Sequence, residues 1–153
     1  MIELAERYND SYPACTFRLN TDGDLRQFDS GSFDFVYSNI VLQHLPSVPE
    51  ITTYLHELIR VTARDGLVVI GLANRVRFPY SLQVRRRVYA LLRRLGVSES
   101  WMLRRTPLTP MRMTWMPQAE VLRVVEGDGA KLLAVEVAGG GLAPGRRYYI
   151  SPA

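Results

Sequence analysis

The sequence is poor in cysteine and has no long apolar run. Its 153 residues include a single cysteine, Cys15, which cannot close an internal disulfide or form a metal site alone. No apolar stretch approaches the roughly 20 residues that cross a bilayer, and the start lacks the basic and apolar segments of a secretory signal. We therefore predict a cytoplasmic protein with no membrane span, no disulfide framework and no metal site.

Acidic residues are almost absent from one part of the chain. The net charge is +4 at neutral pH, and residues 75–105 carry nine arginines against one acid, Glu99. The arginines stand at positions 75, 77, 85, 86, 87, 93, 94, 104 and 105. The positive charge is therefore local, and it indicates either an anionic partner or an ordinary solvated helix face.

The stretch 33–46 is the one around which the other segments are arranged. Its first five residues have the length of a strand and are apolar except for Asp34, and the polar pair Ser38 and Asn39 follows. A strand that is apolar on both faces is typical of a parallel sheet covered by helices, in which ligands bind beyond the carboxyl ends of the strands. We predict a buried strand that ends at a ligand site.

A second strand follows after one helix. Ser47 and Glu50 fit a capping box, and the helix that they begin has to end by the turn signal at residues 65–66. Residues 67–73 form a continuous apolar run that ends at Asn74. The pattern predicts a right-handed βαβ crossover over residues 34–73. The apolar face of its helix comprises Ile51, Tyr54, Leu55, Leu58 and Ile59.

The amino-terminal residues have weaker patterns. Residues 1–10 have helical spacing, and Pro13 would close this helix. Residues 15–19 are a strand candidate, and residues 20–24 have the composition of a loop rich in carboxylates.

The carboxyl-terminal half alternates helices and strands. Residues 81–95 predict a helix with apolar residues on one side and arginines on the other, and residues 101–115 predict a loop or lid because they have no clean period. Residues 117–126 predict another helix. Residues 131–137 and 147–150 predict an antiparallel hairpin at the edge of the sheet.

Five motifs follow one another at residues 23–25, 32–38, 42–45, 58–61 and 65–70. Their order and spacing resemble those of the class I S-adenosylmethionine-dependent methyltransferases, in particular the type 11 group. The resemblance implies an α/β fold with a doubly wound, Rossmann-like sheet, mostly parallel and ending in an antiparallel hairpin. It also implies one methyltransferase domain over residues 1–153 with a basic insertion at about 75–116, S-adenosylmethionine as cofactor and a small-molecule methyl acceptor.

In this family the loop after the third strand holds the adenine through an acidic side chain and a backbone amide. The residues that match are Asp24 and Leu25, with Asp22 as the second choice for the acid. Without the resemblance both acids would be interpreted as turn residues, which bond local amides.

The residues that follow the fourth strand line the methionine part of the cofactor and the substrate in this family. They correspond to Ser38, Asn39, Gln43 and His44. Methyl transfer depends mostly on positioning, and a base is needed only where the acceptor must lose a proton. His44 is the candidate base or substrate contact, although a structural histidine is the commoner case, and Asn74 could touch substrate or cap the next helix.

The sequence also departs from the family. The glycine-rich loop after the family's first strand and the ribose-binding acid after its second have no counterpart, so we expect an amino-terminally truncated domain that lacks two strands and has little activity in isolation. The anchor strand would keep an unpaired apolar edge, through which we expect self-association.

The basic segment 75–105 leaves three interpretations open. The first is a solvated helix face. The second is a cap that binds the methyl acceptor, because arginines would suit an anionic acceptor. The third is a surface that binds nucleic acid or an anionic membrane. Its aromatic residues form no stacking motif, which disfavours nucleic acid. A second hypothesis for the chain is therefore a non-catalytic, degenerate methyltransferase relative that binds an anionic partner through these arginines.

Overall fold

The chain folds around a four-stranded sheet of order β1-β2-β4-β3. This computed structural model describes residues 2–9, 14–78, 80–139 and 143–153. The parallel pair at one side consists of β1 and β2, and β4 pairs antiparallel with both β2 and β3. The strands are β1 (Phe33–Asn39), β2 (Thr62–Ala73), β3 (Lys131–Ala138) and β4 (Gly145–Ser151).

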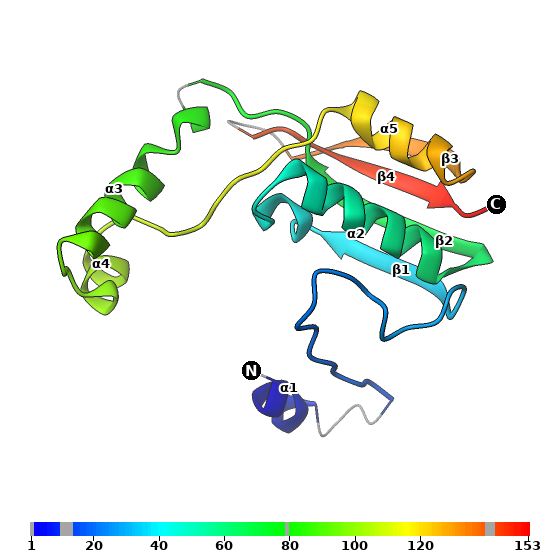
Figure 1. The fold of residues 1–153 in the computed structure, drawn as a ribbon, viewed down its shortest axis with the longest axis horizontal. Helices are drawn as coiled ribbons and strands as arrows, with labels where there is room; N and C mark the ends of the chain where they lie inside the picture. The colour runs from blue at the N-terminus through cyan, green and yellow to red at the C-terminus, as the bar shows by residue number, and fades with distance from the viewer. Residues whose placement is uncertain (1, 10–13, 79, 140–142) are drawn as a thin grey trace.

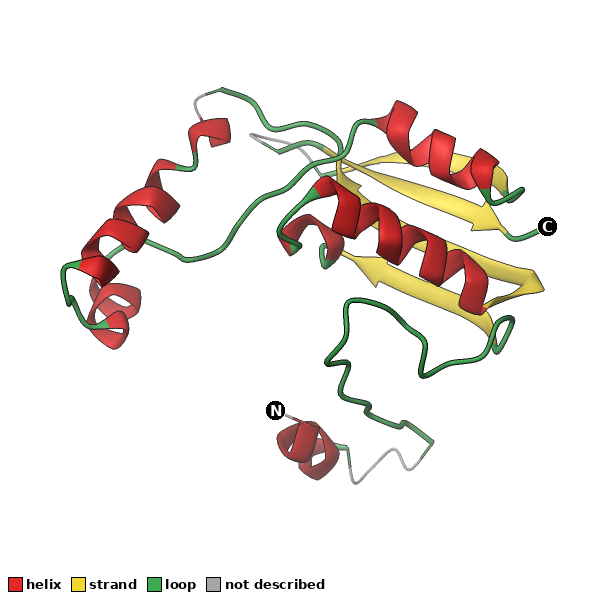
Figure 2. Ribbon diagram, viewed as in Figure 1, coloured by secondary structure: helices red, strands yellow, loops and turns green. Residues whose placement is uncertain are grey.

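Two helices cover one face of this sheet. They are α2 (Val48–Val61) and α5 (Gln118–Gly127), and both lie on the same side of the strands (Figures 1 and 2). Their apolar residues pack with alternate residues of β2 and β4, because successive side chains of a strand point to opposite faces. The predicted α/β class with a carboxyl-terminal antiparallel hairpin is confirmed. The core includes Ile51, Leu55, Val68, Ile70, Val121, Val125, Tyr148 and Ile150.

The predicted βαβ crossover is confirmed as β1, α2 and β2. The Ser47 hydroxyl accepts a hydrogen bond from the Glu50 amide and donates one to the Glu50 carboxylate. The turn predicted at residues 65–66 is wrong, since β2 already begins at Thr62. The pairing of β1 with β2 is irregular between Phe33 and Phe35, so the extra residues are absorbed in a bulge instead.

The prediction that the anchor strand is buried on both faces is wrong. In β1, Phe35 is 58% and Tyr37 55% exposed, and their rings are stacked with centroids 6.3 Å apart. They lie on the face opposite α2 and α5, and no described residue covers them. An apolar run on both faces therefore does not by itself bring a second layer of helices.

The predicted strand at residues 15–19 is also wrong. In the described part of the chain these residues have no strand partner, and the Leu19 side chain is exposed. A strand needs a neighbour for its backbone hydrogen bonds, which a sequence pattern does not supply. The amino-terminal helix is confirmed as α1 (Ile2–Tyr8), with no buried residue, while the expected stop at Pro13 lies outside the described residues.

Between β2 and α5 the chain forms a helical arm that stands away from the sheet (Figure 1). It comprises the 3-10 turn η2 (Tyr80–Leu82), α3 (Val84–Arg94) and α4 (Glu99–Arg105). The predicted helix 81–95 is interrupted at Gln83, whose φ is 48°. The loop predicted over 101–115 is wrong in its first part, which belongs to α4.

The helix predicted at 117–126 and the antiparallel hairpin are confirmed as α5 and as β3 with β4. Within the hairpin, β3 is the edge strand and β4 is internal, because β4 lies between β2 and β3. This insertion brings the side chains of β4 next to those of β2, which matters for the site described next.

Candidate functional site

A cavity lies where the carboxyl ends of β1 and β2 meet the beginning of β4. Its volume is about 230 Å³, and its lining includes Asn39, Ile40, Gln43, Gly71 and Arg147. Parallel strands place their carboxyl ends at one edge of the sheet, and ligands of open α/β sheets bind there. The predicted site residues Asn39 and Gln43 therefore lie together in one cavity.

The floor of the cavity depends on a glycine. Asn39 pairs with Gly71 across the parallel strands, and a Cβ added at Gly71 would lie 2.0 Å from the Asn39 Oδ1 atom. The Asn39 amide thus occupies the space that any other residue at position 71 would fill. Gly71 fixes where this amide lies.

The backbone beside the cavity is strained. Ile40 directly follows β1 and has φ of 66°, in the left-handed region that a β-branched side chain rarely adopts. Its amide donates to the Gly71 carbonyl over 3.2 Å. Such outliers concentrate at ligand sites, where the surrounding structure holds them in place.

Arg147 brings a positive charge to the cavity from β4. It pairs with Gly71 in the sheet register, and its Nη1 lies 3.8 Å from the Glu136 Oε2 atom. A hydrogen bond with Tyr149 raises the pKa of Arg147. Among the described residues, the Arg147 Nε has no hydrogen-bond partner, and this atom is buried. The sequence analysis missed this residue.

The 3-10 turn η1 (Leu42–His44) closes the cavity and is held by the segment that follows the arm. The Thr114 amide donates to the Gln43 carbonyl over 2.7 Å, and the His44 Nδ1 lies 2.9 Å from the Arg112 carbonyl oxygen. A carbonyl only accepts, so the Nδ1 atom carries a proton and a neutral His44 keeps its Nε2 as an acceptor. His44 is not among the residues that line the cavity.

The side chain of Ser38 lies on the opposite face of the sheet from that of Asn39. It is buried and pairs with Ile70, a core residue beneath α2, so its side chain lies on the helix-covered face of the sheet. Its predicted contact with a ligand stays a prediction.

The predicted adenine loop is bonded to α2. The Leu25 amide donates to the Glu57 carboxylate over 2.9 Å, and the Asp24 carboxylate forms an ion pair with Arg26 at 2.9 Å. Asp22 is exposed, and its carbonyl accepts from the Tyr54 hydroxyl. None of these three residues lines the cavity at Asn39. Their role in binding adenine also stays a prediction.

The ion pair of Glu57 and Arg60 supports this loop. The Arg60 Nε lies 2.7 Å from Glu57, and the other guanidinium nitrogens donate to the carbonyls of Leu25 and Phe28. The hydrogen bond from Arg60 lowers the pKa of Glu57, and the amide of Leu25 acts in the same direction. The pair of charges thus ties residues 25–30 to the carboxyl-terminal part of α2.

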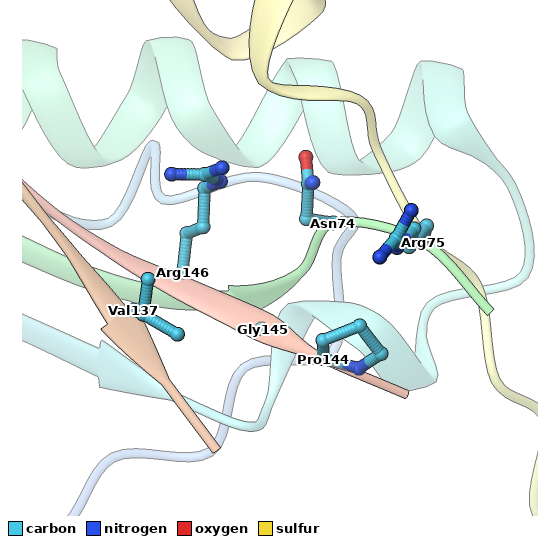
Figure 3. A pocket seen from close by; sticks show the side chains of 6 residues that line it. All are labelled: Asn74, Arg75, Val137, Pro144, Gly145 and Arg146. Atoms are coloured by element: carbon cyan, nitrogen blue, oxygen red, sulfur yellow. The ribbon is translucent and has the colours of Figure 1, made fainter. Parts of the chain in front are cut away.

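A second cavity of about 330 Å³ lies at the end of β2 and the beginning of β4, and the side chains that line it are drawn in Figure 3. Asn74 and Arg146 project there from the end of β2 and from β4. The Asn74 Oδ1 accepts from the Gln118 amide over 2.9 Å, so this side chain caps α5. The expectation that Asn74 caps the next helix is wrong, because the side chain bonds to the first residue of α5 rather than of α3.

Within the described residues no group of three or more histidine, cysteine or acidic side chains could hold a metal ion. In the same part of the chain, no helix has the length and apolarity needed to cross a membrane.

Known proteins resemble this chain in part of its sequence and in its fold. A family model described as a methyltransferase domain matches residues 1–70. The resemblance to class I methyltransferases of type 11 is confirmed.

Solved structures with the same fold align with nearly the whole chain. A methyltransferase from Methanosarcina mazei is 16% identical with a TM-score of 0.65, and the match covers 99% of this chain and 76% of that one. Magnesium protoporphyrin IX methyltransferase from Synechocystis, crystallised with bound SAH, is 14% identical with a TM-score of 0.62 and coverages of 99% and 58%. At these identities the likeness concerns the fold.

A third match, a protein from Pyrococcus horikoshii, is 15% identical with a TM-score of 0.62 and coverages of 99% and 66%. The chain therefore spans 66% of the length of the Pyrococcus horikoshii protein and 58% of the length of the Synechocystis enzyme. No curated protein matches the sequence.

Proposed function

We propose that this chain is part of an S-adenosylmethionine-dependent methyltransferase whose cofactor and small-molecule acceptor meet at the carboxyl ends of β1 and β2. The observation that carries the proposal is the cavity in which the Asn39 amide, Gln43 and Arg147 converge around Gly71. A cavity with a few convergent polar groups at this edge of an α/β sheet is where binding is expected.

The residues present fit one end of the cofactor. The guanidinium of Arg147 suits a carboxylate, and the amides of Asn39 and Gln43 can bond to an amino or carboxylate group. The space of about 230 Å³ is smaller than the roughly 300 Å³ at which drug-sized pockets begin, so it suits the amino-acid end rather than the entire molecule. Asp22, Asp24 and Leu25 would hold the adenine, and Ser38 would lie behind the site.

Bound S-adenosylmethionine supplies a methyl group that its sulfonium activates toward a nucleophile. The chain contributes position: the strained turn at Ile40 holds Asn39 and Gln43 in place, and the bond from His44 to Arg112 holds η1. If the acceptor has to lose a proton, the Nε2 of His44 is the acceptor atom available in this turn.

The proposal is tested by calorimetric titration of S-adenosylhomocysteine into the 153-residue chain and into the longest natural form of the protein. We expect little affinity and little activity in the 153-residue chain and clear binding in the longer form. Failure of both forms to bind would contradict the proposal, and would favour the non-catalytic relative that binds an anionic partner.

The substitution Gly71→Ala tests whether the ligand binds in the cavity beside Asn39. The new Cβ would meet the Asn39 Oδ1 at 2.0 Å and displace that side chain, so we expect affinity for S-adenosylhomocysteine to fall about tenfold in whichever form binds. Gly127→Ala is the matched control, because a Cβ at Gly127 has no heavy atom within 4 Å. Equal affinities in the two variants would place the ligand elsewhere.

A further inference from the structure

The helical arm exposes a continuous apolar stripe on α3. Val84, Val88, Leu91 and Leu95 follow one another at intervals of four, three and four residues, so they lie along one side of the helix. Val84 is 55%, Leu91 57% and Leu95 71% exposed. No described residue covers this stripe.

Arginines border the stripe on both edges. Arg87 and Arg94 each follow a stripe residue by three positions and lie along one edge, while Arg85 precedes Val88 by three positions and lies along the other. All three are exposed. The helix thus presents apolar surface in the middle and positive charge at its margins.

The remaining side of α3 is already occupied. Tyr89 is buried between the two helices of the arm, and its hydroxyl donates to Glu99 of α4 over 2.9 Å. Met102 of α4 is fully buried. The pairing with α4 therefore stabilises the arm through a different side of the helix and leaves the stripe free.

The geometry points to an anionic lipid bilayer as the partner of this stripe: α3 lies in the plane of the membrane surface, with the stripe in the acyl boundary and the arginines at the headgroups. Basic amphipathic helices bind in this way, through buried apolar area and attraction to anionic lipid. Nucleic acid would pair with the arginines but would leave the exposed leucines in water. This distinction selects lipid over nucleic acid.

The second helix of the arm, α4, also exposes apolar and basic side chains. Trp101 in α4 is 53% exposed, and Leu103 and the arginines 104 and 105 are exposed beside it. Tryptophan is enriched at the interface between lipid and water, because its ring is apolar with one polar edge. Figure 1 places the arm beyond the carboxyl end of β1, at the same end of the molecule as the cavity.

Flotation of the full chain with vesicles tests the inference. We expect it to float with vesicles of equal parts phosphatidylcholine and phosphatidylglycerol, to stay in solution with phosphatidylcholine alone, and to be partly released by high salt. The fluorescence of Trp101 should shift to the blue on binding, and Trp101→Phe should remove that shift. A chain that remains in solution with the anionic vesicles at low salt overturns the inference.

Two pairs of substitutions separate the apolar and the charged contributions. Leu91→Asp with Leu95→Asp should lower vesicle binding about tenfold or more, because each leucine loses its transfer into lipid. Arg87→Gln with Arg94→Gln should lower it about tenfold or more and weaken its salt dependence. The matched controls, Leu133→Asp on β3 and Arg64→Gln with Arg123→Gln on β2 and α5, are exposed residues outside the arm and should bind as the unaltered chain does.

The same variants identify the alternative partner. If the Asp variants bind vesicles as the unaltered chain does, the stripe is not in contact with lipid and the inference is wrong. Binding to duplex DNA that depends on Arg87 and Arg94 but not on the leucines, without flotation, would likewise overturn it in favour of nucleic acid. Circular dichroism verifies folding, and Leu91→Ser with Leu95→Ser provides a milder pair if the Asp pair unfolds.

Discussion

The helices α2 and α3 both carry apolar residues at helical spacing, yet only α2 buries them. In α2 the stripe of Ile51, Leu55 and Leu58 lies against the sheet, while in α3 the stripe of Val88, Leu91 and Leu95 faces outward. The difference shows that helical periodicity predicts an amphipathic helix but not what its apolar face contacts. A neighbouring sheet decides that for α2, and α3 stands beyond the sheet's edge.

The largest effect we expect comes from Leu55→Ala in α2. Leu55 is 1% exposed within the main core, so its truncation leaves a cavity and should lower the free energy of unfolding by about 3 kcal/mol. Urea denaturation followed by circular dichroism measures this. A loss below about 1 kcal/mol would mean that the core relaxes around the substitution.

An intermediate effect is expected at the ion pair that joins α2 to the amino-terminal loop. The pKa of Glu57 is lowered from its ordinary value of 4.5, because the Arg60 guanidinium bonds to the carboxylate. A lowered pKa in the folded state contributes stability that is present above pH 4.5 and is lost as pH falls through the folded value. Glu57→Gln should therefore cost about 2 kcal/mol at neutral pH.

The pH dependence distinguishes this ion pair from simple loss of contacts. The difference in unfolding free energy between Glu57→Gln and the unaltered chain should shrink as the pH is lowered below 4.5, since Glu57 of the unfolded chain then takes up a proton while the folded carboxylate is still ionised. A difference that stays constant with pH would assign the effect to packing instead. Thr53→Ala, an exposed change on the same helix, is the control.

The smallest effect is expected for Leu91→Ala in α3, the same substitution as in α2. Leu91 is 57% exposed, so its truncation should alter the unfolding free energy by less than about 0.5 kcal/mol in the absence of lipid. Vesicles that bind the arm should enlarge this difference, because Leu91 then stabilises the bound form. A large cost without lipid would indicate that another part of the protein covers the stripe.

Local sequence patterns were sufficient to predict most helices and strands, but they did not predict which elements would pack or pair with one another. The spacing of Leu55 and Ile59, the cap at Ser47 and the apolar run of β2 are set by interactions within a few residues, and the structure confirms the elements that they predict. Residues 15–19 have an equally plausible strand pattern but form no strand, because a strand also needs a partner from elsewhere in the chain.

In the candidate site, too, some residues could be predicted from local sequence and others depend on contacts between distant parts of the chain. Asn39 was predicted because the end of a parallel strand is a binding position in α/β sheets, and Gln43 because of the resemblance to methyltransferases. Both line the cavity. Arg147 was not predicted, since no local pattern indicates that β4 lies between β2 and β3. Ser38 was predicted alongside Asn39, but successive residues of a strand face opposite sides, and the fold placed Ser38 beneath α2.

By itself the sequence determined the βαβ unit, the resemblance to methyltransferases and the amphipathic character of the arm, because periodicity, caps and charge are properties of neighbouring residues. Only the tertiary structure decided that Arg147 would meet Asn39 across Gly71, that Phe35 and Tyr37 would be exposed and that the stripe on α3 would face outward. These depend on strand order and on which surfaces meet, and both are set by contacts between distant parts of the chain.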